Sequence, residues 1–188
     1  MDSPFMEEFA RRLARVGVSV VRFEFPYMQE RRTLGRKRPP DRQPVLLECW
    51  REAVSRYAHA QPLFIGGKSM GGRMATVLAS EELPVKGVVA LGYPFHPPGK
   101  PDRLRTDHLA QMRCPALVVQ GERDPFGRRD EVSHYMLPPF LQVCWIPQGD
   151  HDLQPPKRSG LPYEENLALA VTAVKEFIEK SLGQDVGG

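Results

Sequence analysis

The spacing of apolar residues along the chain changes several times between a helical period and short continuous runs. Over residues 3–16 apolar residues recur about every fourth position, and Ser3 followed by Pro4 matches the preferences at a helix start. The next stretch, VSVVRFEF at 18–25, is rich in β-branched and aromatic residues and predicts a strand. The proline- and arginine-rich segment 26–44 predicts a loop.

From residue 44 onwards, helical and strand patterns alternate. The apolar strand candidates are of the near-continuous kind found in parallel sheets covered on both faces. We therefore expect one α/β domain over residues 1–188, with a mostly parallel sheet and helices on both faces. The predicted helices lie at 44–60, 70–80 and 162–182, and the predicted strands at 62–66, 86–92, 115–121 and 140–147.

The composition is that of an ordinary soluble globular protein, with 41% hydrophobic and 26% charged residues. No apolar run approaches the ~18 residues of a membrane span, and the opening MDSPFMEEFA has no signal-peptide pattern. A net charge of +3 is too small to predict nucleic-acid binding. The spacing of Cys49, Cys114 and Cys144 fits neither a disulfide framework nor a zinc site, so we expect a cytoplasmic protein.

The stretch LFIGGKSMGGRMA at 63–75 resembles two different motifs. One is the phosphate-binding Walker loop, G-x-x-x-x-G-K-[ST], in which the segment Gly67–Ser69 would require a first glycine at position 62. Pro62 stands there instead, and proline supplies neither the turn nor the N–H. The spacing therefore argues against an NTPase.

The other motif is G-x-S-x-G, which predicts a nucleophile elbow centred on Ser69. A strand candidate precedes this serine and a helix candidate follows it, as an elbow requires. Strand and helix nearly touch at such a turn, so the residues two positions away on either side, Gly67 and Gly71, must be small. The helix start would also place the N–H of Met70 in position to stabilise an oxyanion.

A catalytic serine needs a histidine base and an acid that orients it, and after an elbow of this kind the acid comes first in the chain. The acid should follow a strand at the carboxyl edge of the sheet. The sequence GERDPFG after strand candidate 115–121 offers Asp124, with Glu122 as the fallback. Asp130 is assigned to the following helix.

The base is expected in the loop after the last strand. The sequence QGDHDLQP in that loop contains His151. Asp150 and Asp152 flank this histidine and are rival acids, although adjacent residues rarely fold back squarely onto an imidazole. The sequence thus predicts a Ser69, Asp124 and His151 triad.

The remaining histidines receive weaker assignments. His96 follows a strand candidate on the catalytic edge and is a candidate for the pocket wall. His108 and His134 fall in predicted helices and are expected at the surface. No two histidines have metal-ligand spacing, so no metal and no cofactor are expected.

Several stretches spread over nearly the whole chain resemble one family. The chain looks like the α/β-hydrolase group of dienelactone-hydrolase-like serine hydrolases that includes the testis-expressed protein 30 type and the related domain of a chromatin-complex subunit. The resemblance implies an α/β-hydrolase fold and the Ser69–Asp124–His151 triad, and it implies no particular substrate. The matching stretches are MDSPFM, VVRFEFPYM, GGKSMGGRMA, LGYPFHPPGKP, GERDPFG and GDHDL followed by RSG.

The family pattern also raises a question about the amino-terminal side of the sheet. In that fold a strand and an HGAG-like oxyanion loop precede the first helix, and the strand lies between those expected at 18–25 and 62–66. The sequence begins almost at Ser3, so we expect the natural domain to extend upstream of Met1 and Asp2. Direct pairing of the two strands, or pairing with a second copy of the chain in a homodimer, are the alternatives.

Cations gather in the 26–44 segment and beside the predicted nucleophile and base. Strand carboxyl ends are where α/β folds bind ligands, so the substrate is expected to be a small acyl ester, thioester or related compound that carries negative charge. A solvated basic loop without such a role explains the segment equally well. The candidate substrate-binding residues are Lys68, Arg73, His96 and Arg158, and the basic loop contains Arg31, Arg32, Arg36, Lys37, Arg38 and Arg42.

Two classes of function remain. The first is a serine hydrolase that works through an acyl-enzyme intermediate on Ser69. The second is a non-catalytic interaction module that keeps the hydrolase fold. No aromatic residues interleave the cations of the basic loop, so neither nucleic acid nor membrane is an expected partner.

Overall fold

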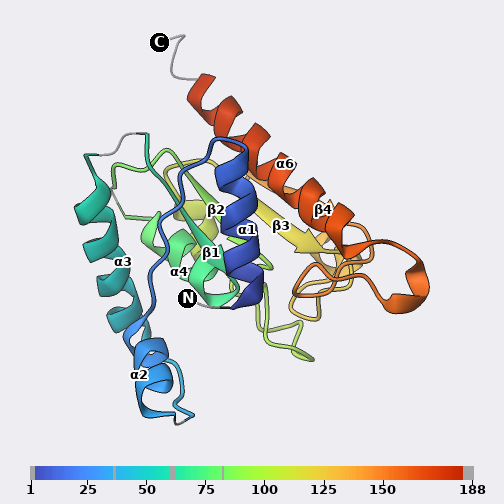
Figure 1. Ribbon diagram of the computed structural model, residues 1–188, viewed down its shortest axis with the longest axis horizontal. Helices are drawn as coiled ribbons and strands as arrows, with labels where there is room; N and C mark the ends of the chain where they lie inside the picture. Colours follow the sequence, from blue (N-terminus) through green and yellow to red (C-terminus); the bar gives the residue numbers. More distant parts are fainter. Residues whose placement is uncertain (1–2, 36, 60–61, 82, 184–188) are drawn as a thin grey trace.

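A sheet of four parallel strands lies at the centre of the computed structural model, which describes residues 3–35, 37–59, 62–81 and 83–183. The strands lie in the order β1-β2-β3-β4, each hydrogen-bonded to the next (Figure 1). Because all four run in the same direction, their carboxyl ends meet at one edge of the sheet. The strands are β1 (Phe64–Lys68), β2 (Gly87–Leu91), β3 (Ala116–Gly121) and β4 (Leu141–Ile146).

Helices cover both faces of this sheet (Figure 1). On one face lie α1 (Pro4–Arg15) and α6 (Tyr163–Gly183), and on the other lie α3 (Gln43–Tyr57) and α4 (Met70–Leu78). The shorter helical segments are α2 (Pro26–Leu34), α5 (Arg129–Val132) and the 3-10 turns η1 (Asp107–Gln111) and η2 (Lys157–Ser159).

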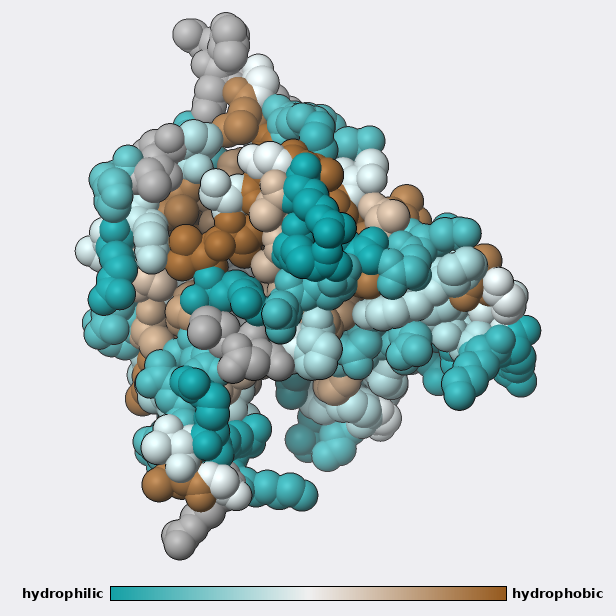
Figure 2. Space-filling view, viewed as in Figure 1, coloured by the Kyte–Doolittle hydropathy of each residue, from teal (hydrophilic) through white to brown (hydrophobic). Residues whose placement is uncertain are grey.

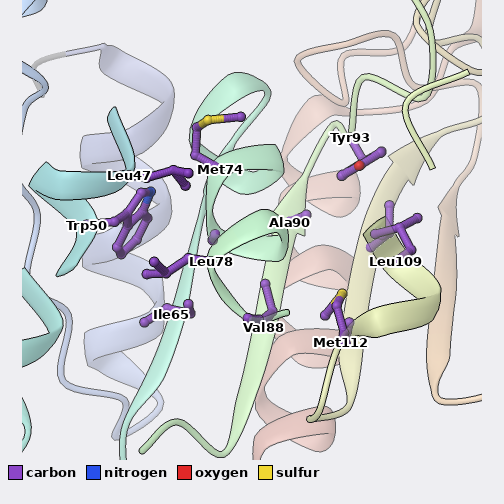
Figure 3. Packing of buried hydrophobic residues seen from close by; sticks show 14 of the residues in the cluster. Leu47, Trp50, Ile65, Met74, Leu78, Val88, Ala90, Tyr93, Leu109 and Met112 are labelled. Atoms are coloured by element: carbon purple, nitrogen blue, oxygen red, sulfur yellow. The ribbon is translucent and has the colours of Figure 1, made fainter. Parts of the chain in front are cut away.

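The side chains of the inner strands divide between two hydrophobic cores. In β3, Leu117 and Val119 pack beneath α1 and α6, whereas Ala116 and Val118 face α3 and α4. Figure 3 shows the core on the side of α3 and α4, in which Trp50 of α3 lies against the side chains of α4 and of the sheet. Every residue of β3 is buried, which explains why the strand is apolar on nearly all its positions.

The predicted α/β architecture is confirmed by this arrangement. The four strands predicted from residue 62 onwards are all present, and only the first is displaced, by two residues. The predicted helix start is also present, since the hydroxyl of Ser3 accepts a hydrogen bond from the Met6 N–H at 3.2 Å. No helix in the described ranges is long and apolar enough to cross a membrane.

The prediction of a strand at 18–25 is wrong. This segment is not part of the sheet, so β1 forms the edge of the sheet among the described residues. Its aromatic residues serve packing instead, because Phe23 meets the Trp50 ring edge-on with centroids 4.6 Å apart. Val20 and Val21 are 38% and 58% exposed, and Figure 2 shows apolar surface between α1 and α3.

The loop predicted over 26–44 is wrong for its first half, which forms helix α2. Pro26 occupies the first turn of this helix, where its fixed φ favours the helical conformation and its missing N–H has no cost. The following residues are mostly good helix formers. Gly35 ends the helix with φ at 62°. Proline is common both at helix starts and in loops, so the sequence alone did not distinguish the two here.

Candidate active site

Ser69 lies at the sharp turn between β1 and α4. Its backbone angles, φ 53° and ψ −118°, fall in a region that residues other than glycine rarely adopt. The Ser69 N–H donates to the carbonyl of Leu91 at 2.8 Å, which extends the pairing of β1 with β2 up to the serine itself. The turn thus places the serine at the carboxyl edge of the sheet, directly before a helix.

Close packing of α4 against the sheet accounts for two of the neighbouring glycines. A Cβ atom on Gly72 would lie 2.6 Å from the Gly67 carbonyl oxygen and 2.9 Å from the Ala90 Cβ. A Cβ atom on Gly67 would lie 3.0 Å from the carbonyl carbon of Gly71. The sequence prediction that Gly71 itself must be small is wrong, because a Cβ there would meet nothing within 4 Å.

Asp124 lies in the turn after β3 and is fully buried. One carboxylate oxygen accepts from the N–H of Phe126 at 2.9 Å. The other accepts from the amide of Gln120 at 3.0 Å and lies 2.8 Å from Nδ1 of His151. A carboxylate in this position fixes the imidazole with Nε2 directed away from the acid, ready to serve as a base.

The rival acids are all engaged elsewhere. Glu122 accepts from the Gln148 N–H at 3.0 Å and pairs with Arg129 at 2.6 Å, and these bonds lower the pKa of Glu122. Asp150 accepts the N–H groups of its own turn. Asp152 forms an ion pair with Lys68 at 2.8 Å. Of the described carboxylates, Asp124 is the one that meets His151.

The loop that carries His151 is held from two sides. From α6, the buried amide of Asn166 donates to the carbonyl groups of Pro147 and Leu153, at 3.1 and 2.8 Å. From β1, the ammonium group of Lys68 donates to the carbonyl of His151 at 3.0 Å. Lys68, predicted to contact substrate, therefore anchors the loop of the histidine.

Two further contacts fix the imidazole ring of His151. The Phe126 ring packs against it with centroids 4.5 Å apart. Gly92, with φ at 62°, lets the chain after β2 pass close by, since a Cβ there would lie 3.1 Å from Nδ1. The ring is thus placed between the ends of β2 and β3.

Among the described residues no hydrogen bond joins Ser69 to His151, so the predicted triad is not complete. The imidazole is bound to Asp124, and its loop is bound to Lys68 and Asn166. The N–H of Met70, in the first turn of α4, has no partner within the helix, because the first amides of any helix lack one. It is the donor nearest in sequence to the serine.

The other predicted substrate-binding residues are spread over different surroundings. The imidazole of His96 is buried, with Nδ1 2.8 Å from the Pro97 carbonyl and Nε2 3.5 Å from Glu131 of α5. Arg158 is exposed on η2. Arg73 is half-buried on α4, one helical turn after Ser69.

Three cations of the basic segment are engaged with groups within it or just before it. Arg32 pairs with Glu24 at 2.9 Å, and Arg38 pairs with Glu30 and with Asp41, the latter at 3.0 Å. Arg31 donates to the carbonyl of Arg38 at 2.6 Å. Lys37 and Arg42 are exposed, and Arg36 lies outside the described residues.

His108 is a polar residue that the sequence wrongly assigned to the surface. It lies half-buried on η1, with Nε2 2.9 Å from the Thr76 hydroxyl and 3.4 Å from the Tyr93 hydroxyl. The Thr76 hydroxyl donates to the carbonyl of Arg73 at 2.7 Å, so it accepts its second bond from the Nε2–H of His108. No spacing signal marks this contact, which joins α4 to η1.

The surroundings of His108 keep its ring neutral. Burial, together with the nearby charge of Arg73, lowers the pKa of His108 to about 4, while Asp107 acts in the opposite direction. Burial also raises the pKa of Tyr93 to about 12. Both groups are therefore uncharged near neutral pH.

Within the described residues no group of three histidine, cysteine, aspartate or glutamate side chains is placed to hold a metal ion.

Comparison with known proteins defines the class to which this fold and site belong. A family model described as an alpha/beta hydrolase domain matches residues 1–179. The chain therefore belongs to the alpha/beta hydrolase domain family. Its finer resemblance to the testis-expressed protein 30 type stays a prediction.

Three solved structures illustrate the shared fold. The esterase domain of a Rhodothermus marinus protein is 20% identical, with a TM-score of 0.63, over 94% of this chain and 79% of that one. A lidless α/β serine hydrolase from Xanthomonas campestris is 18% identical, with a TM-score of 0.67, over 96% and 74%. Est1E from Butyrivibrio proteoclasticus is 17% identical, also with a TM-score of 0.67, over 97% and 83%.

The contrast between Gly71 and Gly72 gives a matched pair of stability predictions. Gly72→Ala should lower the free energy of unfolding by about 1–3 kcal/mol, because its methyl group would collide with backbone at the β1–α4 contact. Gly71→Ala should raise it by about 0.5–1 kcal/mol, because alanine favours the helix and has room there. Urea unfolding of both variants checks this. Equal effects would contradict the packing described for Gly72.

A second prediction concerns the effect of His108 on stability at acidic pH. The unfolded chain binds a proton at His108 near the ordinary pKa of 6.5, whereas the folded chain does so only near 4. The contribution of this histidine to stability is therefore present in full above about pH 6.5 and is lost as the pH falls to about 4. His108→Gln should flatten the pH dependence of urea unfolding in that window. His134→Gln, at an exposed histidine, should leave it unchanged.

Proposed function

We propose that the protein is a serine hydrolase that cleaves an ester, thioester or related acyl bond through an acyl-enzyme intermediate on Ser69. The observation that carries this proposal is the strained backbone of Ser69 at the same sheet edge as the paired Asp124 and His151. Strain of this kind persists only where the surrounding structure imposes it, and it concentrates at functional sites. Membership in the alpha/beta hydrolase domain family supports the same class of reaction.

The reaction would proceed in two halves. Nε2 of His151 takes the proton of the Ser69 hydroxyl as Oγ attacks the carbonyl carbon, and the N–H of Met70 stabilises the oxyanion. The tetrahedral intermediate collapses, and the leaving alcohol or thiol takes the proton back from His151. Water then repeats the sequence, with the same base, to release the acid and restore Ser69. Asp124 stabilises the imidazolium that forms in each half.

The proton transfer sets a geometric requirement. Nε2 of His151 and Oγ of Ser69 must come within about 2.6–3.2 Å. Among the described residues the histidine is bonded to Asp124 and not to the serine, so the proposal requires a closer approach during turnover. Catalytic hydrogen bonds often tighten in this way when a substrate is bound.

The same observation favours the second candidate function. A hydrolase-fold interaction module would keep the Asp124–His151 bond for stability and would have no need of a bond to Ser69. The two functions differ in one property, which is the reactivity of the Ser69 hydroxyl. A serine without a working base is a weak nucleophile.

The reactivity of Ser69 is tested with a fluorophosphonate probe. The protein should become labelled at Ser69, and Ser69→Ala should abolish labelling. Asp124→Asn should slow it by on the order of 10³–10⁴, because the amide no longer holds the catalytic tautomer of His151. Ser133→Ala, at an exposed serine, is the matched control and should label normally. Equal labelling of Ser69→Ala would refute the proposal and leave the interaction module.

Lys68 should act as a positioning residue rather than as a substrate contact. Lys68→Met keeps the apolar stem and removes the bonds to the His151 carbonyl and to Asp152. Labelling by a neutral probe should therefore slow by up to about 100-fold through misplacement of the base. Lys157→Met, at an exposed lysine on η2, should have no effect on the labelling rate. An unchanged rate in Lys68→Met would contradict this role.

A further inference from the structure

Two arginines lie on segments that follow the carboxyl ends of β1 and β2, the edge of the sheet at which Ser69 lies. Arg73 lies on α4, and its N–H donates to the Ser69 carbonyl at 3.0 Å. Residues four apart lie on the same face of a helix, and Cα–Cβ bonds tilt towards the helix amino terminus. The stem of Arg73 therefore leads back towards the end of α4 that carries Ser69.

Arg105 reaches the same region from the segment between β2 and η1. Its N–H donates to the carbonyl of Phe95 at 2.8 Å, and its own carbonyl accepts from the Tyr93 hydroxyl at 2.8 Å. Tyr93 comes directly after Gly92, the residue against which the ring of His151 packs. Figure 3 shows Tyr93 beyond Ala90 of β2, near the segment that carries Leu109. Arg105 is thus tied to the residues that border the histidine.

Both arginines lack the partners that most buried cations have. Nε of Arg73 is buried with no hydrogen-bond partner among the described residues. Neither guanidinium forms an ion pair with a carboxylate in the described ranges, whereas Arg12, Arg38 and Arg51 each do. Burial and the charge of Arg73 lower the pKa of Arg105, so the two cations are close enough to repel one another.

The tyrosine, histidine and threonine around the two arginines add hydrogen bonding but no countercharge. Asp107 acts electrostatically on His108 but forms no ion pair with either arginine among the described residues. Tyr93 and His108 are uncharged near neutral pH, and the Thr76 hydroxyl is already bonded to His108 and to the Arg73 carbonyl. A half-buried pair of like charges with an unsatisfied donor is unfavourable unless an anion joins it. A carboxylate or phosphate would supply both the acceptor and the charge, and guanidinium groups suit the two geometrically.

We propose that Arg73 and Arg105 together bind the anionic group of the substrate, beside the serine that attacks its acyl bond. The proposal rests on the proposed hydrolase function and names its substrate class, an acyl ester or thioester that carries a carboxylate or phosphate. The sequence suggested a broad basic surface as the binding site for the anion, and the proposal assigns that role to one pair of side chains. Lys68, Arg31, Arg32 and Arg38 are engaged with other groups and take no part.

Hydrolysis of matched esters tests the pair. The wild-type protein should prefer the half ester of adipic acid with 4-nitrophenol over 4-nitrophenyl hexanoate, measured as the ratio of the two kcat/KM values. Arg73→Gln and Arg105→Gln should each lower that ratio by on the order of tenfold, because each removes one charge-assisted contact. Arg103→Gln removes an exposed charge two residues from Arg105 and should leave the ratio unchanged. The hexanoyl ester of 4-hydroxybenzoate places the anion on the leaving group and shows which side of the substrate binds the pair.

A binding measurement separates this proposal from the proposed function. Adipate and inorganic phosphate should raise the melting temperature of the Ser69→Ala protein, and Arg105→Gln in that background should remove the effect while Arg103→Gln keeps it. Stabilisation through Arg105 without Ser69 labelling would support the anion site and refute the hydrolase. Labelling of Ser69 with equal rates on both esters and no stabilisation would overturn the anion site and leave the hydrolase standing. An effect of Arg103→Gln equal to that of Arg105→Gln would also overturn it, because general surface charge would then explain the preference.

Discussion

The close contact between α4 and the first two strands is the constraint on which the rest of the site depends. The backbone of Gly72 approaches Gly67 and Ala90 so closely that no side chain fits between them. The chain must therefore reverse direction within one residue, and Ser69 takes the strained angles φ 53° and ψ −118° that this reversal demands. The strain is held because the Ser69 N–H still pairs with Leu91 and the helix begins at once. A looser contact would let the serine relax away from the sheet edge.

A buried amide transmits this order to the other half of the site. The side chain of Gln120 on β3 accepts from the Tyr93 N–H at 2.7 Å and donates to Asp124 at 3.0 Å and to the carbonyls of Tyr93 and Gly127, each at 3.2 Å. A polar group buried at 0% exposure is tolerated only when it is bonded in this way. Gln120 thereby connects Asp124, which is bonded to His151, with Tyr93. The hydroxyl of Tyr93 in turn donates to the backbone carbonyl of Arg105. Gln120 and Tyr93 therefore connect the Asp124–His151 pair to the backbone of Arg105.

Local patterns predicted the parts of the fold and site that local physics decides. The apolar run of β3, the turn at Ser69 and the pairing of Asp124 with His151 could be predicted from the sequence, because parallel strands bring the residues at their ends to one edge. The extended segment 18–25 could not, since aromatic residues favour packing against α3 as much as pairing in a sheet. The difference between Gly71 and Gly72 also stayed hidden, because it depends on which helix face meets the sheet.

The cations near Ser69 show most clearly why residue type and sequence position are insufficient to predict which side chains bind a ligand. Lys68 and Arg73 lie on either side of Ser69 in the sequence, and both suggest an anionic substrate. The fold gives Lys68 a carboxylate, a carbonyl and an aromatic ring, so its charge is satisfied within the protein. It brings Arg73 instead beside Arg105, a residue 32 positions away with no motif to mark it, and gives the pair no carboxylate among the described residues. Whether a cation supports the site or meets a ligand is decided by its partners, and these come from segments that only the folded chain brings together.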